Sequence, residues 1–197
     1  EGFFNASAFG GGTQEGAILI GAVNKYVGGF IGIIENTSSR NVTDITLTEK
    51  GTVNAATNLK NIKLYYESDI TAPYDCGSET YNGTENQFGL TVNSFNGPNG
   101  AASFSGSVPI SKTAAMCVYA VLDVGSDALL GETIELEITN PVLDILVNAG
   151  TIGPANAVLI PGTTLIRNVF GLTESHYRWR NDDGGETGSE GWYNVNW

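Results

Sequence analysis

The side chains best suited to acid–base or cation chemistry are concentrated at the C-terminal end of the chain. This stretch, residues 176–197, reads H-Y-R-W-R-N-D-D-G-G-E-T-G-S-E-G-W-Y-N-V-N-W and holds the single histidine, all three tryptophans and two of the four arginines. In an extended strand, His176, Arg178 and Arg180 would lie on one face, with Tyr177 and Trp179 on the other. One histidine supports neither a Ser-His-Asp triad nor a multi-histidine zinc site, so we expect no enzymatic activity.

Oxygen ligands for a hard cation also lie in this tail. Asp182, Asp183 and Glu186 stand in a Gly-rich stretch, and carboxylate oxygens are the ligands that calcium prefers. Their spacing does not match an EF-hand loop, so we favour a solvated acidic turn and keep a calcium site as the alternative. We therefore expect no cofactor, with calcium as the single alternative.

The aromatic side chains of the tail have two interpretations. Exposed rings can stack on sugars, and Tyr177, Trp179, Trp192, Tyr193 and Trp197 would form such a platform. Alternatively, the rings dock into an apolar surface of their own domain or of a neighbouring subunit. We favour docking and keep glycans as the alternative partners.

Composition excludes two other classes of partner. The 197 residues carry a net charge of −12, and nothing in them offers the clustered cations that nucleic-acid phosphates require. The apolar stretch 17–34 is interrupted by Asn24, Lys25 and several glycines, whereas a spanning helix needs about 20 continuous apolar residues. We expect two core strands there and no membrane span.

Two features indicate an extracellular protein. Cys76 and Cys117 are too few for a metal cage and would form one disulfide in an oxidising compartment, with two buried thiols as the alternative. Asn-x-Ser/Thr sequons, which are possible N-glycosylation sites, stand in turn-like sequence at Asn5, Asn36, Asn41 and Asn82. The first residue is Glu1 rather than Met, so we expect a processed protein or a fragment of a longer surface protein.

The dominant periodicity of the chain is two. Apolar residues alternate with polar ones over 45–48, 62–66, 104–110 and 133–138, and turn residues separate these runs. The run 116–124 is apolar on both parities, which indicates a central strand between two sheets. The one predicted helical turn covers 126–130. The pattern predicts an all-β fold, an antiparallel β-sandwich of the jelly-roll or immunoglobulin-like kind, spanning residues 13–172.

Several ordered segments resemble a family of extracellular β-sandwich modules of bacterial surface proteins. They are V-T-D-I-T-L-T-E-K-G-T-V at 42–53, N-L-K-N-I-K-L-Y-Y-E at 58–67, the stretch 73–77, and V-Y-A-V-L-D-V-G-S-D-A-L-L-G-E-T-I-E-L-E-I at 118–138. The motif H-Y-R-W-R-N-D-D-G at 176–184 resembles one that often follows such modules. The resemblance implies a structural or adhesive role at the cell surface and transfers no catalytic residues. This chain departs from the family pattern by ending soon after the motif.

Both ends of the chain are candidate donor strands for assembly. Residues 1–12 are predicted to form an extended arm, with Phe3, Phe4 and Phe9 as anchors and the glycines 10–12 as a hinge. Residues 173–197 are the other candidate. The residues expected at this tail interface are Tyr177, Arg178, Trp179, Arg180, Trp192 and Trp197.

A terminal strand that completes the sheet of the next subunit makes a head-to-tail contact, and such contacts generate fibres. We therefore predict a secreted structural subunit that binds copies of itself in an extracellular filament or surface layer. The alternative is a carbohydrate-binding or adhesive module of a larger cell-surface protein.

Overall fold

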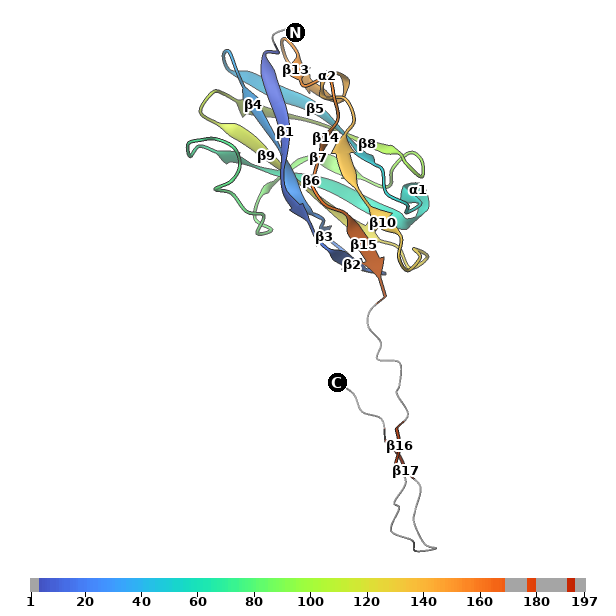
Figure 1. Ribbon diagram of the computed structural model, residues 1–197. Helices are drawn as coiled ribbons and strands as arrows, with labels where there is room; N and C mark the ends of the chain where they lie inside the picture. The colour runs from blue at the N-terminus through green and yellow to red at the C-terminus, as the bar shows by residue number, and fades with distance from the viewer. Residues whose placement is uncertain (1–3, 169–176, 180–190, 194–197) are drawn as a thin grey trace, which may run out of the picture. The chain divides into compact units, whose positions relative to one another are not determined.

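The computed structural model describes residues 4–168, 177–179 and 191–193 (Figure 1). The chain divides into two compact units, residues 1–167 and 168–197. The division lies five residues before the expected change at residue 172.

The first unit is built almost entirely of strands. They are β1 (Ala6–Gln14), β2 (Ala17–Leu19), β3 (Lys25–Tyr26), β4 (Gly28–Glu35), β5 (Arg40–Glu49), β6 (Leu59–Asp69), β7 (Asn86–Val92), β8 (Ala101–Ile110), β9 (Ala115–Val124), β10 (Thr133–Ile134), β11 (Leu136–Ile138), β12 (Ile145–Val147), β13 (Ile152–Gly153), β14 (Val158–Leu159) and β15 (Thr164–Arg167). Two single helical turns, α1 (Ala55–Asn58) and α2 (Pro141–Asp144), complete it.

These strands form two main sheets that face each other, which confirms the predicted β-sandwich. One sheet has the order β13-β1-β4-β9-β6-β7, with β3 also pairing to β9. The other has the order β12-β5-β11-β14, with β8 pairing to β5, and a small sheet β10-β15-β2 adjoins them. Nearly all pairs are antiparallel; β1 with β13 and β15 with β2 are parallel. Within the part of the chain that the structure describes, no helix is long and apolar enough to span a membrane.

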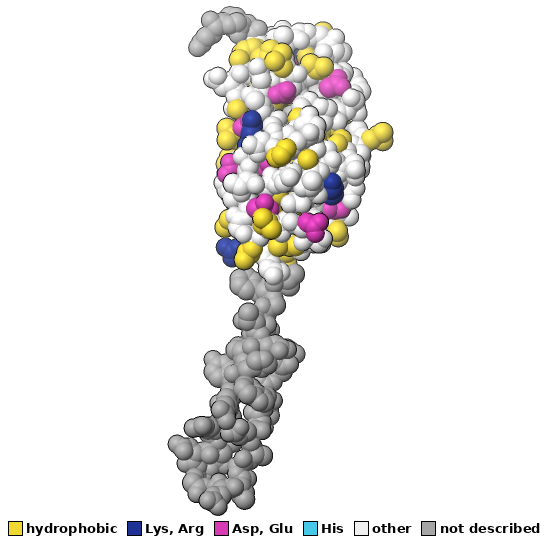
Figure 2. Space-filling model, turned by 90° about the vertical axis from the view of Figure 1, so that its right-hand side faces the viewer, with side chains coloured by type: hydrophobic (Ala, Val, Ile, Leu, Met, Phe, Trp, Pro, Cys, Tyr) yellow, Lys and Arg dark blue, Asp and Glu magenta, His cyan; other side chains and the backbone are white. Residues whose placement is uncertain are grey.

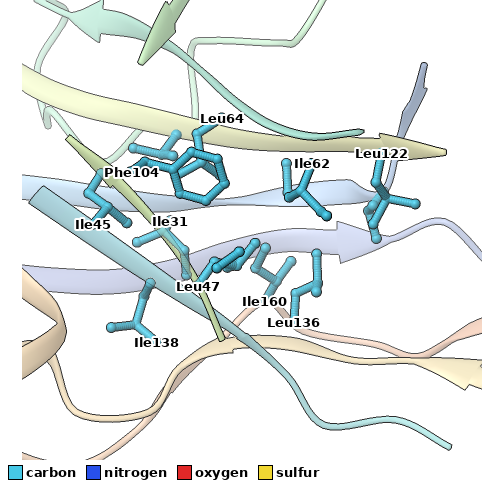
Figure 3. Close-up of a cluster of buried hydrophobic side chains, with 14 of the residues drawn as sticks. Ile31, Ile45, Leu47, Ile62, Leu64, Phe104, Leu122, Leu136, Ile138 and Ile160 are labelled. Carbon is cyan, nitrogen blue, oxygen red and sulfur yellow. The ribbon is translucent and has the colours of Figure 1, made fainter. Parts of the chain in front are cut away.

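The period-two alternation builds the core between the sheets (Figure 3). In β6, Ile62 and Leu64 are buried while Lys63 on the opposite parity is only half-buried. Phe104 of β8 and Ile45 of β5 reach the same cluster from the facing sheet. Each such fully buried side chain contributes about 1.5–3 kcal/mol relative to an exposed one. The alternating runs in the sequence therefore define the inner faces of the sheets.

Strand β9 is buried on both faces, but only one face lies against the other sheet. Met116 and Val118 enter the core cluster, as the apolar run predicts. Cys117 and Tyr119, on the opposite parity, belong to a separate cluster that the segment 70–85 covers with Tyr74 and Tyr81. The outer face of β9 is therefore sealed by a covalently attached loop rather than by a second sheet, which corrects the sequence prediction.

The N-terminal segment is a strand of its own sheet, so the predicted free arm with a glycine hinge is wrong. Strand β1 pairs with β4 from Ala6↔Glu35 to Gln14↔Gly28 and also contacts β13. A Cβ atom at Gly10 would overlap the carbonyl oxygen of Leu159, and one at Gly11 would overlap the Phe30 ring. These glycines permit close packing between strands rather than hinge motion.

The predicted phenylalanine anchors are correspondingly used within the domain. Phe9 packs edge-on against Phe30, with ring centroids 6.4 Å apart. Phe4 lies against Gly153, where a Cβ atom would overlap its ring. Phe3 lies outside the described residues. The described part of this segment therefore has its partners inside its own sandwich.

A second pair of strands meets closely at the opposite edge of the sandwich. A Cβ atom at Gly89 of β7 would lie 2.6 Å from the carbonyl oxygen of Ser105 in β8. The two sheets are thus brought together where β1 meets β14 and where β7 meets β8. Glycine is required at both crossings because any side chain would push the backbones apart.

The predicted helical turn at 126–130 does not form. Ala128 is buried in the core, and hydrogen bonds from Ala128 N to Gly125 O (3.3 Å) and from Glu132 N to Leu129 O (3.2 Å) close two successive turns instead. This loop leaves Leu129 and Leu130 at the surface.

In the second unit the structure describes two short strands, β16 (Tyr177–Trp179) and β17 (Gly191–Tyr193). They pair antiparallel, with Tyr177 opposite Tyr193 and Arg178 opposite Trp192. The aromatic–basic segment of the sequence therefore forms a strand, as its alternation predicts.

Candidate functional site

A buried carboxylate and a disulfide hold the segment 70–85 against the outer face of β9. Asp69 Oδ1 accepts hydrogen bonds from Thr71 N (2.8 Å) and Ser78 Oγ (3.0 Å), and its Oδ2 accepts one from Cys76 N (2.9 Å). Cys76 is joined to Cys117 with their Cα atoms 5.7 Å apart, which confirms the predicted disulfide. Both cysteines are fully buried.

The segment 70–85 is called the tethered segment. Four tyrosines lie around the disulfide and are called the tyrosine cluster: Tyr26, Tyr65, Tyr81 and Tyr119. Tyr81 from the tethered segment lies 4.7 Å from Tyr26, 5.7 Å from Tyr65 and 5.6 Å from Tyr119, measured between ring centroids. The hydroxyl of Tyr119 donates to Glu67 Oε1 and that of Tyr26 to the Gly29 carbonyl, both at 2.6 Å. The rings are tilted or edge-on to one another, which is the favourable arrangement for aromatic packing.

Two hollows open beside Tyr26. One, of about 470 Å³, is lined by Glu15, residues 17–19, residues 24–26 and Tyr81. The other, of about 450 Å³, is lined by Tyr26, Phe30, Tyr119 and parts of the tethered segment, including Asp75 and Glu79. Both volumes fall in the range of small-ligand sites, about 300–1,000 Å³.

Carboxylates lie near the hydroxyl of Tyr26, and Lys25 also lines the first hollow. Burial, followed by the nearby carboxylates of Glu15 and Glu85, raises the pKa of Tyr26 to about 12. Burial and the hydrogen bond to Glu67 also raise the pKa of Tyr119 above its usual range. These phenols therefore stay protonated at neutral pH and can donate or stack, but they do not act as nucleophiles.

A different feature lies at the two ends of the sandwich. The chain enters the first unit at the end that carries β13 and α2 and leaves it from β15 at the opposite end (Figure 1). At the exit end, four apolar side chains are exposed, and we call them the exit-end surface. They are Leu19 (41% exposed), Val23 (66%), Leu129 (65%) and Leu130 (70%).

Hydrogen bonds show why these four residues lie together. Gly131 N donates to Ile166 O at 2.9 Å, which places the 125–131 loop beside the end of β15. Leu19 of β2 pairs with Arg167 of β15, and Val124 N donates to Ala22 O at 2.8 Å. The loop that bears Leu129 and the turn that bears Val23 therefore flank the point where the chain leaves.

The entry end also exposes apolar side chains and strand edges. Leu143 of α2 is 71% exposed and Leu146 of β12 is 48% exposed. Strands β12 and β13 are the outermost members of their sheets. Figure 2 shows one face of the unit, on which apolar side chains gather toward both ends while charged ones are scattered. An outermost strand offers backbone donors and acceptors for a further strand.

The structure places part of the predicted tail interface in the second unit. Tyr177, Arg178 and Trp179 form β16 and Trp192 lies in β17, whereas Arg180 and Trp197 lie outside the described residues. His176 and the calcium candidates Asp182, Asp183 and Glu186 also lie outside them. Among the residues that are described, no group of three or more His, Cys, Asp or Glu side chains is placed to hold a metal ion.

The tyrosine cluster was not predicted, although the sequence contains a signal for it. In 116–124, Cys117 and Tyr119 share the parity that does not enter the core. In 58–67, Tyr65 has the parity opposite to Ile62 and Leu64. A cysteine and aromatic residues on the outer parity of neighbouring strands indicate that something covers that face.

Comparison with known proteins adds little to this description. No family model matches the chain, and none of the curated proteins matches it. Among solved structures, a family 123 glycoside hydrolase from Clostridium perfringens is similar with a TM-score of 0.40 and 14% sequence identity. The match covers 84% of this chain but only 27% of that enzyme. A TM-score this low carries no argument about function.

Proposed function

We propose that the protein is a secreted structural subunit that polymerises head to tail into an extracellular filament or surface layer. One observation carries the proposal: the chain enters and leaves the sandwich at opposite ends, and both ends expose apolar side chains. Contact between the exit end of one subunit and the entry end of the next uses two different surfaces. Such a heterologous contact does not close on itself unless a rotation brings the ends together, so it generates fibres.

The C-terminal segment is the strand donor in this proposal. Strand β1 is already paired on both sides, with β4 and β13, so donating it would dismantle the main sheet. Residues 173–197 carry strand-forming sequence with the aromatic anchors Tyr177 and Trp179. The outermost strands β12 and β13 at the entry end are the acceptor edges, beside the exposed Leu143 and Leu146.

The disulfide and the glycosylation sequons support an extracellular location. The buried disulfide is of the kind that persists in oxidising compartments and is rare in the cytosol. The sequons support the same location.

Charge placed on the exit-end surface is expected to stop polymerisation. In the full chain, the double substitution Leu129→Glu/Leu130→Glu puts two carboxylates where an apolar contact is proposed, and burying an unpaired charge is strongly unfavourable. Size-exclusion chromatography and negative-stain microscopy should show polymers for the unsubstituted chain and monomers for the variant. Leu90→Glu is the matched control, because Leu90 is 86% exposed and lies in β7 between the residues that pair with Ile62 and Leu64 of β6, outside both proposed contact surfaces; this variant should polymerise.

Two results would contradict the proposal. One is a full chain that stays monomeric at high concentration. The other is a double variant that polymerises as readily as the control. Tyr177→Glu/Trp179→Glu tests the donor separately, and unchanged polymers in that variant would exclude the C-terminal strand from this role.

Carbohydrate binding is the second candidate function, and the hollow beside Tyr26 favours it. Tyrosine rings next to the Asn24 amide and the Glu15 carboxylate combine an apolar face with hydrogen-bonding groups for hydroxyls. The one carboxylate and the one ammonium group that line this hollow, those of Glu15 and Lys25, leave it without net charge, so a neutral glycan is the expected ligand. On a glycan array the full chain should bind such a glycan, and Tyr81→Ala should weaken binding at least tenfold. Tyr74→Ala is the control, since Tyr74 does not line the hollow.

A further inference from the structure

The structure separates the four Asn-x-Ser/Thr sequons by the state of their side-chain amides. An N-linked glycan is attached to the amide nitrogen of asparagine, so that nitrogen must be accessible to the transferring enzyme. All four sequons lie within residues 4–168, where the hydrogen bonds of each amide are known. Among the described residues, only one of these asparagines is both fully exposed and without a hydrogen bond on its amide nitrogen.

That sequon is Asn82-Gly83-Thr84, in the tethered segment. All three residues are exposed. Asn82 Oδ1 accepts hydrogen bonds from Thr84 N (3.0 Å) and Thr84 Oγ1 (2.6 Å), so the threonine hydroxyl of the sequon is bound to its own acceptor asparagine. The side-chain nitrogen Nδ2 of Asn82 makes no hydrogen bond within the described residues. It is therefore the part of the amide that faces outward.

The backbone around Asn82 holds this arrangement in place. Glu85 accepts hydrogen bonds from Asn82 N (2.7 Å) and Gly83 N (2.9 Å) with its two carboxylate oxygens. Gly83 has φ +88°, a conformation that glycine adopts without strain. The preceding residue, Tyr81, is packed in the tyrosine cluster. The turn thus projects from a fixed point on the side of the sandwich.

In the other three sequons the amide nitrogen is hydrogen-bonded or the asparagine is only partly exposed. Asn36 Nδ2 donates to Ser7 Oγ at 2.8 Å, which also occupies the hydroxyl of the Asn5 sequon. Asn41 lies inside β5, and its Nδ2 donates to Ser107 Oγ at 2.9 Å. Asn5 Nδ2 makes no hydrogen bond within the described residues, but Asn5 is half-buried and its Oδ1 is fixed by Thr151 N at 3.2 Å. In none of these three does the sequon hydroxyl hydrogen-bond to its own asparagine.

We infer that Asn82 is the site at which the folded protein accepts an N-linked glycan, and that Asn5, Asn36 and Asn41 are not modified after folding. The donor would be a lipid-pyrophosphate-linked oligosaccharide, used by an oligosaccharyltransferase. Asn82 Nδ2 attacks C1 of the first sugar, the bond from C1 to the pyrophosphate oxygen breaks, and the lipid pyrophosphate leaves with that electron pair. The amide nitrogen loses one proton to a base of the enzyme, so no oxidant or reductant is required.

The test is modification of the purified, folded full chain. The chain is incubated with an oligosaccharyltransferase that accepts Asn-x-Ser/Thr and with its lipid-linked oligosaccharide, and site occupancy is measured by mass spectrometry of proteolytic peptides. Each rate is divided by the rate for a synthetic peptide spanning the same sequon, which removes any preference for local sequence. The normalised rate at Asn82 should exceed that at each other sequon at least tenfold.

Substitutions within the sequons identify the asparagine that carries the glycan. Asn82→Gln and Thr84→Ala should abolish glycan addition, whereas Thr84→Ser keeps the hydroxyl and should retain it. Asn36→Gln should leave the total glycan unchanged. The inference is overturned by an unmodified Asn82 in a chain whose Asn82 peptide is modified, or by equal normalised rates at Asn82 and Asn36. Because no step depends on polymerisation, either result leaves the proposed function standing.

Discussion

Replacing Cys76 and Cys117 with alanine is expected to lower the free energy of unfolding by about 4 kcal/mol. The disulfide closes a loop with a sequence separation of 41 residues, and removing such a cross-link restores about 4 kcal/mol of conformational entropy to the unfolded chain. The native state loses packing as well, because the tethered segment is what covers Tyr119 and the outer face of β9. We expect the loss to be the largest for any change outside the main core.

Urea unfolding followed by tyrosine fluorescence and circular dichroism would measure this effect. As a control, the urea titration is repeated with dithiothreitol, which reduces the disulfide in the unfolded chain. The free energy of unfolding of the unsubstituted chain should then fall to that of the double variant, whose own value should not change. Limited proteolysis should cut the variant within 70–85 first. A loss below about 1 kcal/mol would mean that Asp69 and the aromatic packing hold the segment without the disulfide.

Stability is expected to fall as pH rises from about 5 to 8, and Glu49→Gln is expected to remove most of this dependence. Glu49 is fully buried at the end of β5. Its Oε1 accepts hydrogen bonds from Gly51 N (2.6 Å) and Glu135 N (3.1 Å), while its Oε2 has no partner among the residues that the structure describes. Burial outweighs these hydrogen bonds and raises the pKa of Glu49 from 4.5 to about 7.

The direction of this pH dependence follows from the difference in proton binding between the folded and the unfolded chain. Between pH 4.5 and 7 the unfolded chain has lost this proton while the folded chain still binds it, so each rise in pH favours unfolding. The contribution is fully present below pH 4.5 and is lost as pH rises through about 7, for a total of about 3 kcal/mol. Glutamine stays neutral throughout and keeps an acceptor for the two backbone donors.

Free energies of unfolding at pH 5 and pH 8 would check this prediction. Glu15→Gln is the control, because Glu15 is exposed, and it should keep the slope of the unsubstituted chain. An equal slope in the Glu49→Gln variant would assign the dependence to another group. Glu35 does not interfere: burial raises the pKa of its carboxyl, but hydrogen bonds from Ser38 and Thr37 and the charge of Arg40 lower it more strongly. Its contribution is therefore lost only below pH 4.5.

The layers of the fold could be predicted from the sequence, because apolar and polar residues alternate along each half-buried strand and the apolar ones mark its inner face. Ile62 and Leu64 of β6, and Leu136 and Ile138 of β11, place their side chains in the core as that pattern requires. The disulfide was also predictable, since the chain contains two cysteines and other extracellular signals.

Glycine misled the interpretation of the N-terminus. Residues 10–12 are typical of a flexible link when only local conformation is considered. A tertiary contact requires glycine there: Gly10 lies against the backbone of Leu159, which is 149 positions away in the sequence. No local pattern contains that information, so a close crossing of strands and a hinge have the same sequence signature.

The candidate surfaces were predictable only in part. The tail was identified because unusual residue types are concentrated there. The exit-end surface combines turns near residues 23 and 129, and the tyrosine cluster combines four strands or loops. Both depend on which segments the topology brings together, which residue types alone do not determine.

The two glycine crossings also determine how this protein can aggregate. Backbone edges along the sides of a β-sandwich are the usual templates for uncontrolled stacking of sheets. Here β1 lies against β14 and β7 against β8 so closely that a foreign strand would first have to displace native backbone. Lateral pairing of sheets is thereby disfavoured, so the head-to-tail polymer proposed above should form thin single filaments rather than amorphous or laterally bundled material.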